Sequence, residues 1–128
     1  NEGSVWEAVM AAAHHRLRNL TAIVDRNRIQ MTGRTSDIMG LEPLADKWRA
    51  FGWQVREADG HCFTELLAAL DASADADDDR PRVIIANTIK GKGVSFMEDR
   101  PEWHFKIPSP EQYEAALAEI RRTAGARL

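Results

Sequence analysis

Three separated positions carry side chains suited to binding a metal ion or an anion. Asn27 offers an amide oxygen, and the backbone carbonyls that follow it add oxygen ligands that suit Mg²⁺ or Ca²⁺ better than a softer metal. Lys90 begins a Lys-Gly-Lys-Gly sequence, in which ammonium groups beside glycines suit close approach to a phosphate. His104 lies 14 residues after Lys90 and is able to donate to a phosphate or to transfer a proton near neutral pH.

Each of these positions also has a simpler interpretation. Asn27 is a common turn-forming residue, the lysines suit a solvated basic turn, and His104 is compatible with an incidental loop histidine. Cys62 follows His61 directly, and adjacent residues seldom form a nucleophile and its base. These residue types therefore suggest a site for an anionic ligand and a hard cation but do not by themselves establish one.

Short apolar runs predict three strands, each ending just before polar residues. They occupy residues 20–24, 53–58 and 82–87. The first run has no polar residue on either face except a threonine, which is typical of a strand buried on both faces. The acidic, alanine-rich residues 72–80 are expected to form a solvated connection.

Apolar residues at helical spacing predict four helices between and after these strands. They cover residues 4–17, 43–51 and 63–70 and a last segment starting near residue 110. Ser4 and Glu7 have the spacing of a capping box at the first helix, and Ser109 and Gln112 have it at the last. Gly52 is placed to end the second helix.

Alternating helices and strands predict an α/β fold with a parallel sheet and crossover helices, formed by one domain over residues 1–128. Ligands of such sheets bind at the carboxyl ends of the strands. Three polar segments follow those ends and are expected to face one crevice: residues 25–30, 59–61 and 90–104.

Composition excludes several classes of partner. The formal net charge is −3 with the charges dispersed, so no basic stripe suggests nucleic acid. No apolar run approaches the roughly 20 residues that cross a bilayer, so no membrane is expected. The single cysteine, Cys62, fits a reducing compartment, and the cytoplasm is the expected location.

Five sequence words, in this order and spacing, resemble transketolase, and most of all the separate N-terminal subunit of split bacterial transketolases. They are EGSVWEA (2–8), VDRNRIQ (24–30), DGH (59–61), KGKGVSFME (90–98) and PEWH (101–104). The resemblance covers essentially the whole chain. It implies the thiamine diphosphate-binding fold, with the upstream Gly-Asp-Gly word of that fold falling before residue 1, so that the fold is truncated at its N-terminus.

The resemblance implies a role for four residues. The Asn27 side chain and the Ile29 carbonyl hold the divalent cation, Mg²⁺ or Ca²⁺, through which the diphosphate of thiamine diphosphate is bound. Lys90 lies in the cofactor neighbourhood. His104 contacts the cofactor and the sugar substrate and is the implied catalytic residue.

The implied reaction is transfer of a two-carbon ketol unit between sugar phosphates. In this family the glutamate that activates the cofactor lies in a pyrimidine-binding domain or a C-terminal transketolase subunit, so the isolated chain is expected to be inactive. The implied assembly is a homodimer or heterotetramer. The alternatives are a related thiamine diphosphate enzyme, such as deoxyxylulose phosphate synthase, or a non-catalytic interaction subunit.

Some positions depart from the family pattern or lie at its periphery. Phe105 stands where the family usually has glycine, which bears on substrate preference, and Arg26 precedes the metal-ligand asparagine. Glu2 and Glu7 resemble acids at the dimer interface of the family.

Overall fold

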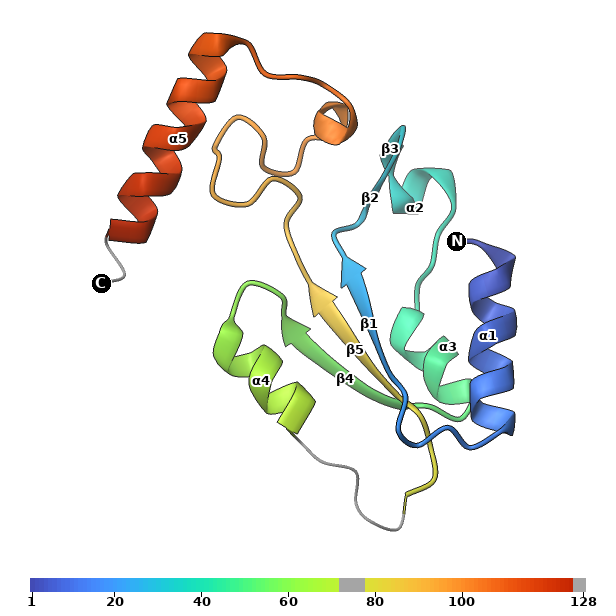
Figure 1. The fold of residues 1–128 in the computed structure, drawn as a ribbon. Helices are drawn as coiled ribbons and strands as arrows, with labels where there is room; N and C mark the ends of the chain where they lie inside the picture. Colours follow the sequence, from blue (N-terminus) through green and yellow to red (C-terminus); the bar gives the residue numbers. More distant parts are fainter. Residues whose placement is uncertain (72–77, 126–128) are drawn as a thin grey trace. The chain divides into compact units, whose positions relative to one another are not determined.

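The computed structural model describes residues 1–71 and 78–125, which form two compact units (Figure 1). The sheet unit comprises Asn1–Arg26 and Met39–Thr88, and the loop unit comprises Asn27–Ile38 and Ile89–Leu128. Most of the stretch expected to be a solvated connection, residues 72–77, lies outside the described residues. No helix in the described ranges combines the length and apolar character needed to cross a membrane.

A parallel three-stranded sheet forms the centre of the sheet unit. Its strands are β1 (Thr21–Arg26), β4 (Gln54–Asp59) and β5 (Arg82–Asn87), in the order β1-β5-β4. β5 pairs in parallel with both neighbours, so that Arg26, Asn87 and Asp59 end the three strands side by side. The predicted parallel α/β fold is confirmed.

Two helices cover one face of this sheet. Side chains of α1 (Gly3–His14) and α3 (Leu44–Ala50) pack on Val83 and Ile85 of the central strand. Trp48 and Trp53 meet edge to face in this core, with ring centroids 4.8 Å apart. The indole N–H of Trp53, the residue before β4, donates to the carbonyl of Val9 in α1 over 2.9 Å, which satisfies a buried donor.

On the other side of the sheet lies α4 (Phe63–Asp71), which contacts β4 and β5 (Figure 1). Ile84 of β5 is 1% exposed on this side, whereas its register partner Ile23 of β1 is 59% exposed. The expectation that the first strand is buried on both faces is therefore wrong for the described part of the chain. β1 is an edge strand of this sheet, and β5 takes the buried central position.

The helix starts give one correction and one confirmation. α1 begins at Gly3 with Glu2 at its N-cap and no side-chain cap, so Ser4 is already inside the helix and the predicted Ser4–Glu7 box does not form. A capping box needs its serine one position before the helix. The predicted box at α5 (Pro110–Gly125) is confirmed. The amide of Ser109 donates to the side-chain oxygen of Gln112 over 3.0 Å, and the amide of Gln112 donates to the hydroxyl of Ser109 over 3.3 Å.

The loop unit contains elements too short to predict from periodicity. Its first segment forms a hairpin of β2 (Ile29–Gln30) and β3 (Gly33–Arg34), followed by α2 (Thr35–Ile38). Its second segment is an irregular loop, then a 3₁₀ turn, η1 (Pro101–His104), and then α5. The predicted long loop is thus interrupted by η1.

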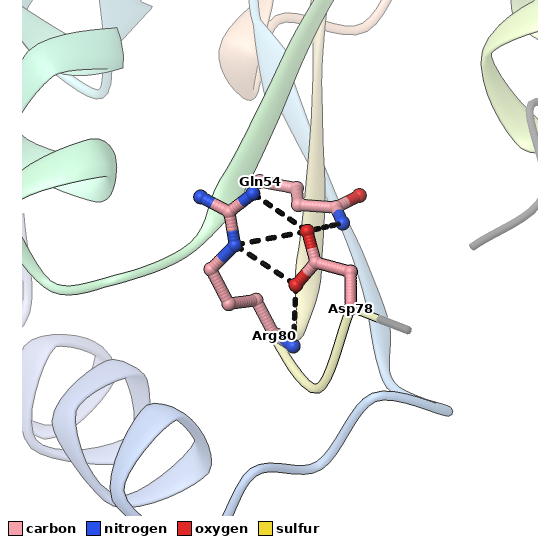
Figure 2. Close-up of polar contacts among 3 residues, drawn as sticks. All are labelled: Gln54, Asp78 and Arg80. Atoms are coloured by element: carbon pink, nitrogen blue, oxygen red, sulfur yellow. Dashed lines mark hydrogen bonds and ion pairs between the residues drawn. The ribbon is translucent and has the colours of Figure 1, made fainter. Parts of the chain in front are cut away.

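A polar cluster closes the amino end of the sheet. Figure 2 shows Asp78 between Gln54, the first residue of β4, and Arg80, which precedes β5. The guanidinium of Arg80 donates to both carboxylate oxygens of Asp78 over 2.6 to 3.0 Å, and the Gln54 amide also donates to Asp78. These bonds, first of all those from Arg80, hold the pKa of Asp78 well below its usual range.

Candidate functional site

Asn27 is held in a defined orientation by the backbone next to it. Its side-chain oxygen accepts the amide N–H of Ile29 over 2.9 Å, and the side chain is half-buried. An amide oxygen has two lone pairs, so one remains after this bond. Asn27 therefore forms a turn, as its residue type predicts, and the same turn fixes the direction of its side-chain oxygen.

Hairpin geometry indicates where the carbonyl of Ile29 points. The amide of Thr35 donates to the carbonyl of Arg28 over 3.0 Å, and the next pairs are Ile29 with Arg34 and Gln30 with Gly33. Because hydrogen-bonded and non-hydrogen-bonded pairs alternate in an antiparallel ladder, Ile29 forms a non-hydrogen-bonded pair. Its N–H turns to Asn27, and its carbonyl likewise turns away from β3.

Lys90 stands at the closure of a compact loop. Its carbonyl accepts the amide of Asp99 over 2.9 Å, which joins the two ends of the segment. Val94 is 6% exposed inside the loop, and Glu98 accepts the amide of Gly93 over 3.0 Å. This bond, followed by the charge of Lys92, lowers the pKa of Glu98. Among the described residues the ammonium of Lys90, a half-buried residue, has no ion-pair partner.

Glycine is required at position 91 in this loop. Gly91 has a φ of +73°, and a Cβ atom built there would lie 2.7 Å from the carbonyl oxygen of Met97. A side chain would both strain the backbone and collide with the opposite side of the loop. The glycine noted in sequence as suited to phosphate approach is thus needed for the closed shape of the loop itself.

His104 is the last residue of η1 and is exposed. Its ring meets that of Phe105 edge to face, with centroids 6.2 Å apart, and Phe105 is itself 75% exposed. The turn is anchored by Trp103, whose indole N–H donates to the carbonyl of Phe96 over 2.9 Å. The ammonium of Lys106 lies 4.7 Å from the Trp103 ring centroid. Two exposed rings thus project beside an anchored tryptophan.

An ion pair links the hairpin to the loop and was not anticipated from sequence. Both terminal guanidinium nitrogens of Arg34, Nη1 and Nη2, donate to Asp99, over 2.9 and 2.5 Å. The bonds from Arg34, followed by its charge and those of Arg28 and Arg100, lower the pKa of Asp99. The partners are 65 positions apart, and no local pattern in the sequence signals such a pair.

The four predicted site residues belong to one unit. Asn27, Ile29, Lys90 and His104 all lie in the loop unit, whereas residues 59–61 lie in the sheet unit. There Asp59 accepts the amide of His61 over 2.9 Å, and the amide of Gly60 donates to the carbonyl of Asn87 over 2.8 Å.

Gly60 allows β4 and β5 to approach closely at their carboxyl ends. A Cβ atom at Gly60 would lie 2.4 Å from the Thr88 methyl group. On the other side of β5, Arg26 donates to Asn87 over 2.7 Å and pairs with Glu42. A cavity of about 250 Å³ beside Arg26 contains none of the four predicted residues.

The oxygen atoms available near Asn27 are of the kind that a hard divalent cation prefers as ligands. Asn27 and Ile29 provide an amide oxygen and a backbone carbonyl, which are ligand types of Mg²⁺ and Ca²⁺. No group of three or more histidine, cysteine, aspartate or glutamate side chains suited to hold a metal occurs in residues 1–71 and 78–125. Any cation bound here would therefore need further ligands from the cofactor, water or another segment.

Comparison with known proteins gives a consistent family. Residues 1–119 match the model of the thiamine diphosphate binding domain of transketolase. The chain is 44% identical over 119 residues to an apulose-4-phosphate transketolase subunit of Phocaeicola vulgatus, covering 93% of this chain and 42% of that protein. It is also 44% identical over 122 residues to the 6-deoxy-6-sulfo-D-fructose transketolase subunit SqwG of a Clostridium species, covering 95% and 44%.

Solved structures agree with the fold. The transketolase of Campylobacter jejuni superposes with a TM-score of 0.83 at 28% identity, over 93% of this chain and 18% of that one. The present chain thus spans less than half the length of the relatives it matches. By the match over residues 1–119 and the 44% identity to these subunits, the chain belongs to the transketolase family and carries sequence of its thiamine diphosphate binding domain.

Proposed function

We propose that this chain forms part of the diphosphate-binding side of a transketolase that transfers a two-carbon ketol unit. The observation that carries the proposal is the turn at Asn27, in which the Ile29 amide fixes the side-chain oxygen while the Ile29 carbonyl turns away from the hairpin. Asn27 and Ile29 would hold a divalent cation, Mg²⁺ or Ca²⁺, that binds the diphosphate. When bound, thiamine diphosphate would supply the nucleophilic carbon for this transfer.

Lys90 and His104 have separate tasks in this proposal. The ammonium of Lys90 would neutralise charge near the diphosphate, and the bond from the Asp99 amide to the Lys90 carbonyl fixes the backbone from which this side chain extends. His104, exposed at the end of η1, donates a hydrogen bond to the sugar or transfers a proton at its hydroxyl groups. The adjacent Phe105 ring borders the same space.

The names of the relatives support a particular organisation and substrate class. Each of the two relatives is named as one subunit of a transketolase. We therefore propose a partner subunit that carries the pyrimidine-binding domain, in a heterotetramer located in the cytoplasm; the homodimer would apply if both domains belonged to one chain. The substrates proposed are ketoses that carry an anionic group, such as sugar phosphates, with 6-deoxy-6-sulfo-D-fructose as a candidate.

The test uses the full-length subunit that contains this chain, with its partner subunit. Thiamine diphosphate is titrated in the presence of Mg²⁺, and ketol transfer to an aldose phosphate acceptor is measured from ketose phosphates and from 6-deoxy-6-sulfo-D-fructose. We expect Mg²⁺-dependent binding and transfer from at least one ketose, and loss of the Mg²⁺-dependent binding in Asn27→Ala. Wild-type protein that neither binds the cofactor nor transfers a ketol unit would overturn the proposal.

A further inference from the structure

The hairpin and the loop that carry the proposed ligands are joined by a forked arginine–aspartate pair. Arg34 Nη1 and Nη2 donate to the two carboxylate oxygens of Asp99 over 2.9 and 2.5 Å. A bidentate pair fixes relative orientation as well as distance, which a single-point contact does not. Both residues lie in the loop unit, so the link is internal to that unit.

Each member of the pair is linked to one proposed ligand. Arg34 lies opposite Ile29 in the hairpin, where the adjacent bond from the Thr35 amide to the Arg28 carbonyl holds the two strands together. The amide of Asp99 donates to the carbonyl of Lys90 over 2.9 Å. A continuous path of one strand pairing, one ion pair and one backbone hydrogen bond therefore runs from Ile29 to Lys90. Relative movement of these residues would break at least one of these interactions.

The backbone at this junction adopts conformations that need support. Asp99 has a φ of +58° and Arg28, next to Asn27, has a φ of +60°. Non-glycine residues in this region carry a conformational cost and persist when surrounding contacts hold them there. The Asp99 contacts to Arg34 and Lys90, and the Arg28 contact to Thr35, supply that support.

We propose that Arg34 and Asp99 are positioning residues that hold the cation-binding hairpin at Asn27 and Ile29 in register with the phosphate-binding lysine, Lys90. The inference rests on the proposed function, because it assigns the pair to the same cofactor site. In this role the pair acts on cofactor binding through Asn27, Ile29 and Lys90. Preorganisation lowers the cost of binding, so its loss weakens affinity more than it slows the chemical step once the cofactor is bound.

The experiment is a double-mutant cycle in the full-length subunit with its partner. The affinity for thiamine diphosphate at saturating Mg²⁺ is measured by cofactor circular dichroism for wild type, Arg34→Gln, Asp99→Asn and the double variant. Each single change is expected to weaken binding roughly tenfold, as is usual for groups that orient metal ligands. The double variant is expected to be no weaker than either single one, since one pair is broken in all three. The kcat at saturating cofactor is expected to stay within about threefold of wild type.

Arg80→Gln is the matched control, because it breaks a comparable Arg–Asp pair in the sheet unit, at the amino end of the strands (Figure 2). It is expected to leave cofactor affinity unchanged. Unchanged affinity in both single variants, additive losses in the double variant, or an equal loss in Arg80→Gln would each overturn the positioning role. Wild-type protein that does not bind thiamine diphosphate would instead overturn the proposed function, and the positioning role with it.

Discussion

At the scale of single residues, Asn27 and Phe105 show how the surroundings select among the uses of a side chain. Asn27 forms the turn that its residue type predicts, and this turn aims its oxygen. Phe105 is not buried as aromatic residues of a core are, because 75% of its surface is exposed. Among the ring contacts of the described residues, its ring meets only that of His104. If His104 acts on the sugar as proposed, the exposed Phe105 ring lies beside the reacting group.

Phe105→Gly is therefore expected to change substrate preference more than overall activity. Removing the ring opens space beside His104, so the ratio of kcat/KM values for two ketoses of different size should move toward unity by roughly tenfold, or about 1.4 kcal/mol. Ile107→Gly is the control, since Ile107 lies two positions further on and is 87% exposed. A ratio unchanged by Phe105→Gly, or changed equally by the control, would contradict this assignment.

At the scale of elements, the features that depend on local sequence were predicted best. β5 begins and ends at the predicted residues, and α5 begins with the predicted cap. The prediction of a capping box at Ser4 is wrong because the helix begins at Gly3, which places the serine inside the helix and not at the cap position. The hairpin of β2 and β3 was missed because two-residue strands show no period.

The cap at Ser109 gives a prediction at this scale. Its hydroxyl accepts the amide of Gln112 over 3.3 Å, and the Gln112 side chain accepts the amide of Ser109. Ser109→Ala is expected to lower the free energy of unfolding by roughly 1 kcal/mol, measured by urea denaturation of the full-length protein. Thr123→Ala, which removes a hydroxyl bonded within α5, is the control and should have a smaller effect. Equal effects would show that the cap is not the source of stability.

The attachment of α5 to the loop gives a prediction about pH. The amide and hydroxyl of Ser95 donate to Glu119 over 2.6 and 2.7 Å, and these bonds, with a smaller contribution from Arg122, lower the pKa of the Glu119 carboxyl from its ordinary value of 4.5. Because the folded-state pKa is depressed, the stabilisation is present above pH 4.5 and is lost as the pH falls from 4.5 through the folded-state pKa.

Ser95→Ala removes the hydroxyl bond and keeps the amide bond. The difference in unfolding free energy between wild type and Ser95→Ala should therefore be present near neutral pH and shrink as the pH falls below 4.5. Denaturant unfolding at several pH values measures it. A difference that stays constant down to about pH 3 would show that the ionised carboxylate is not its source.

At the scale of the whole molecule, the topology explains why two segments far apart in sequence leave the sheet side by side. β1 and β5 are paired in parallel, so the segments that follow Arg26 and Asn87 leave from adjacent strand ends. The sequence rule for parallel sheets anticipates this much. It does not reveal that β1 is an edge strand or that Arg34 bonds Asp99, because both depend on which distant segments become neighbours. Such non-local pairings have no local sequence pattern.

Removal of the cation tests the role of the loop unit in the stability of the assembled enzyme. If Asn27 and Ile29 bind the diphosphate through a divalent cation, thiamine diphosphate with Mg²⁺ stabilises the folded state by RT ln(1 + [L]/Kd), about 2.7 kcal/mol at a hundredfold excess over Kd. A chelator should abolish this gain, Mg²⁺ should restore it, and Asn27→Ala should show little of it under any condition. Thermal unfolding of the assembled subunits measures each state. Stabilisation by the cofactor that survives chelation would show that the diphosphate is held by direct contacts such as those of Lys90, and that the Asn27 turn is structural alone.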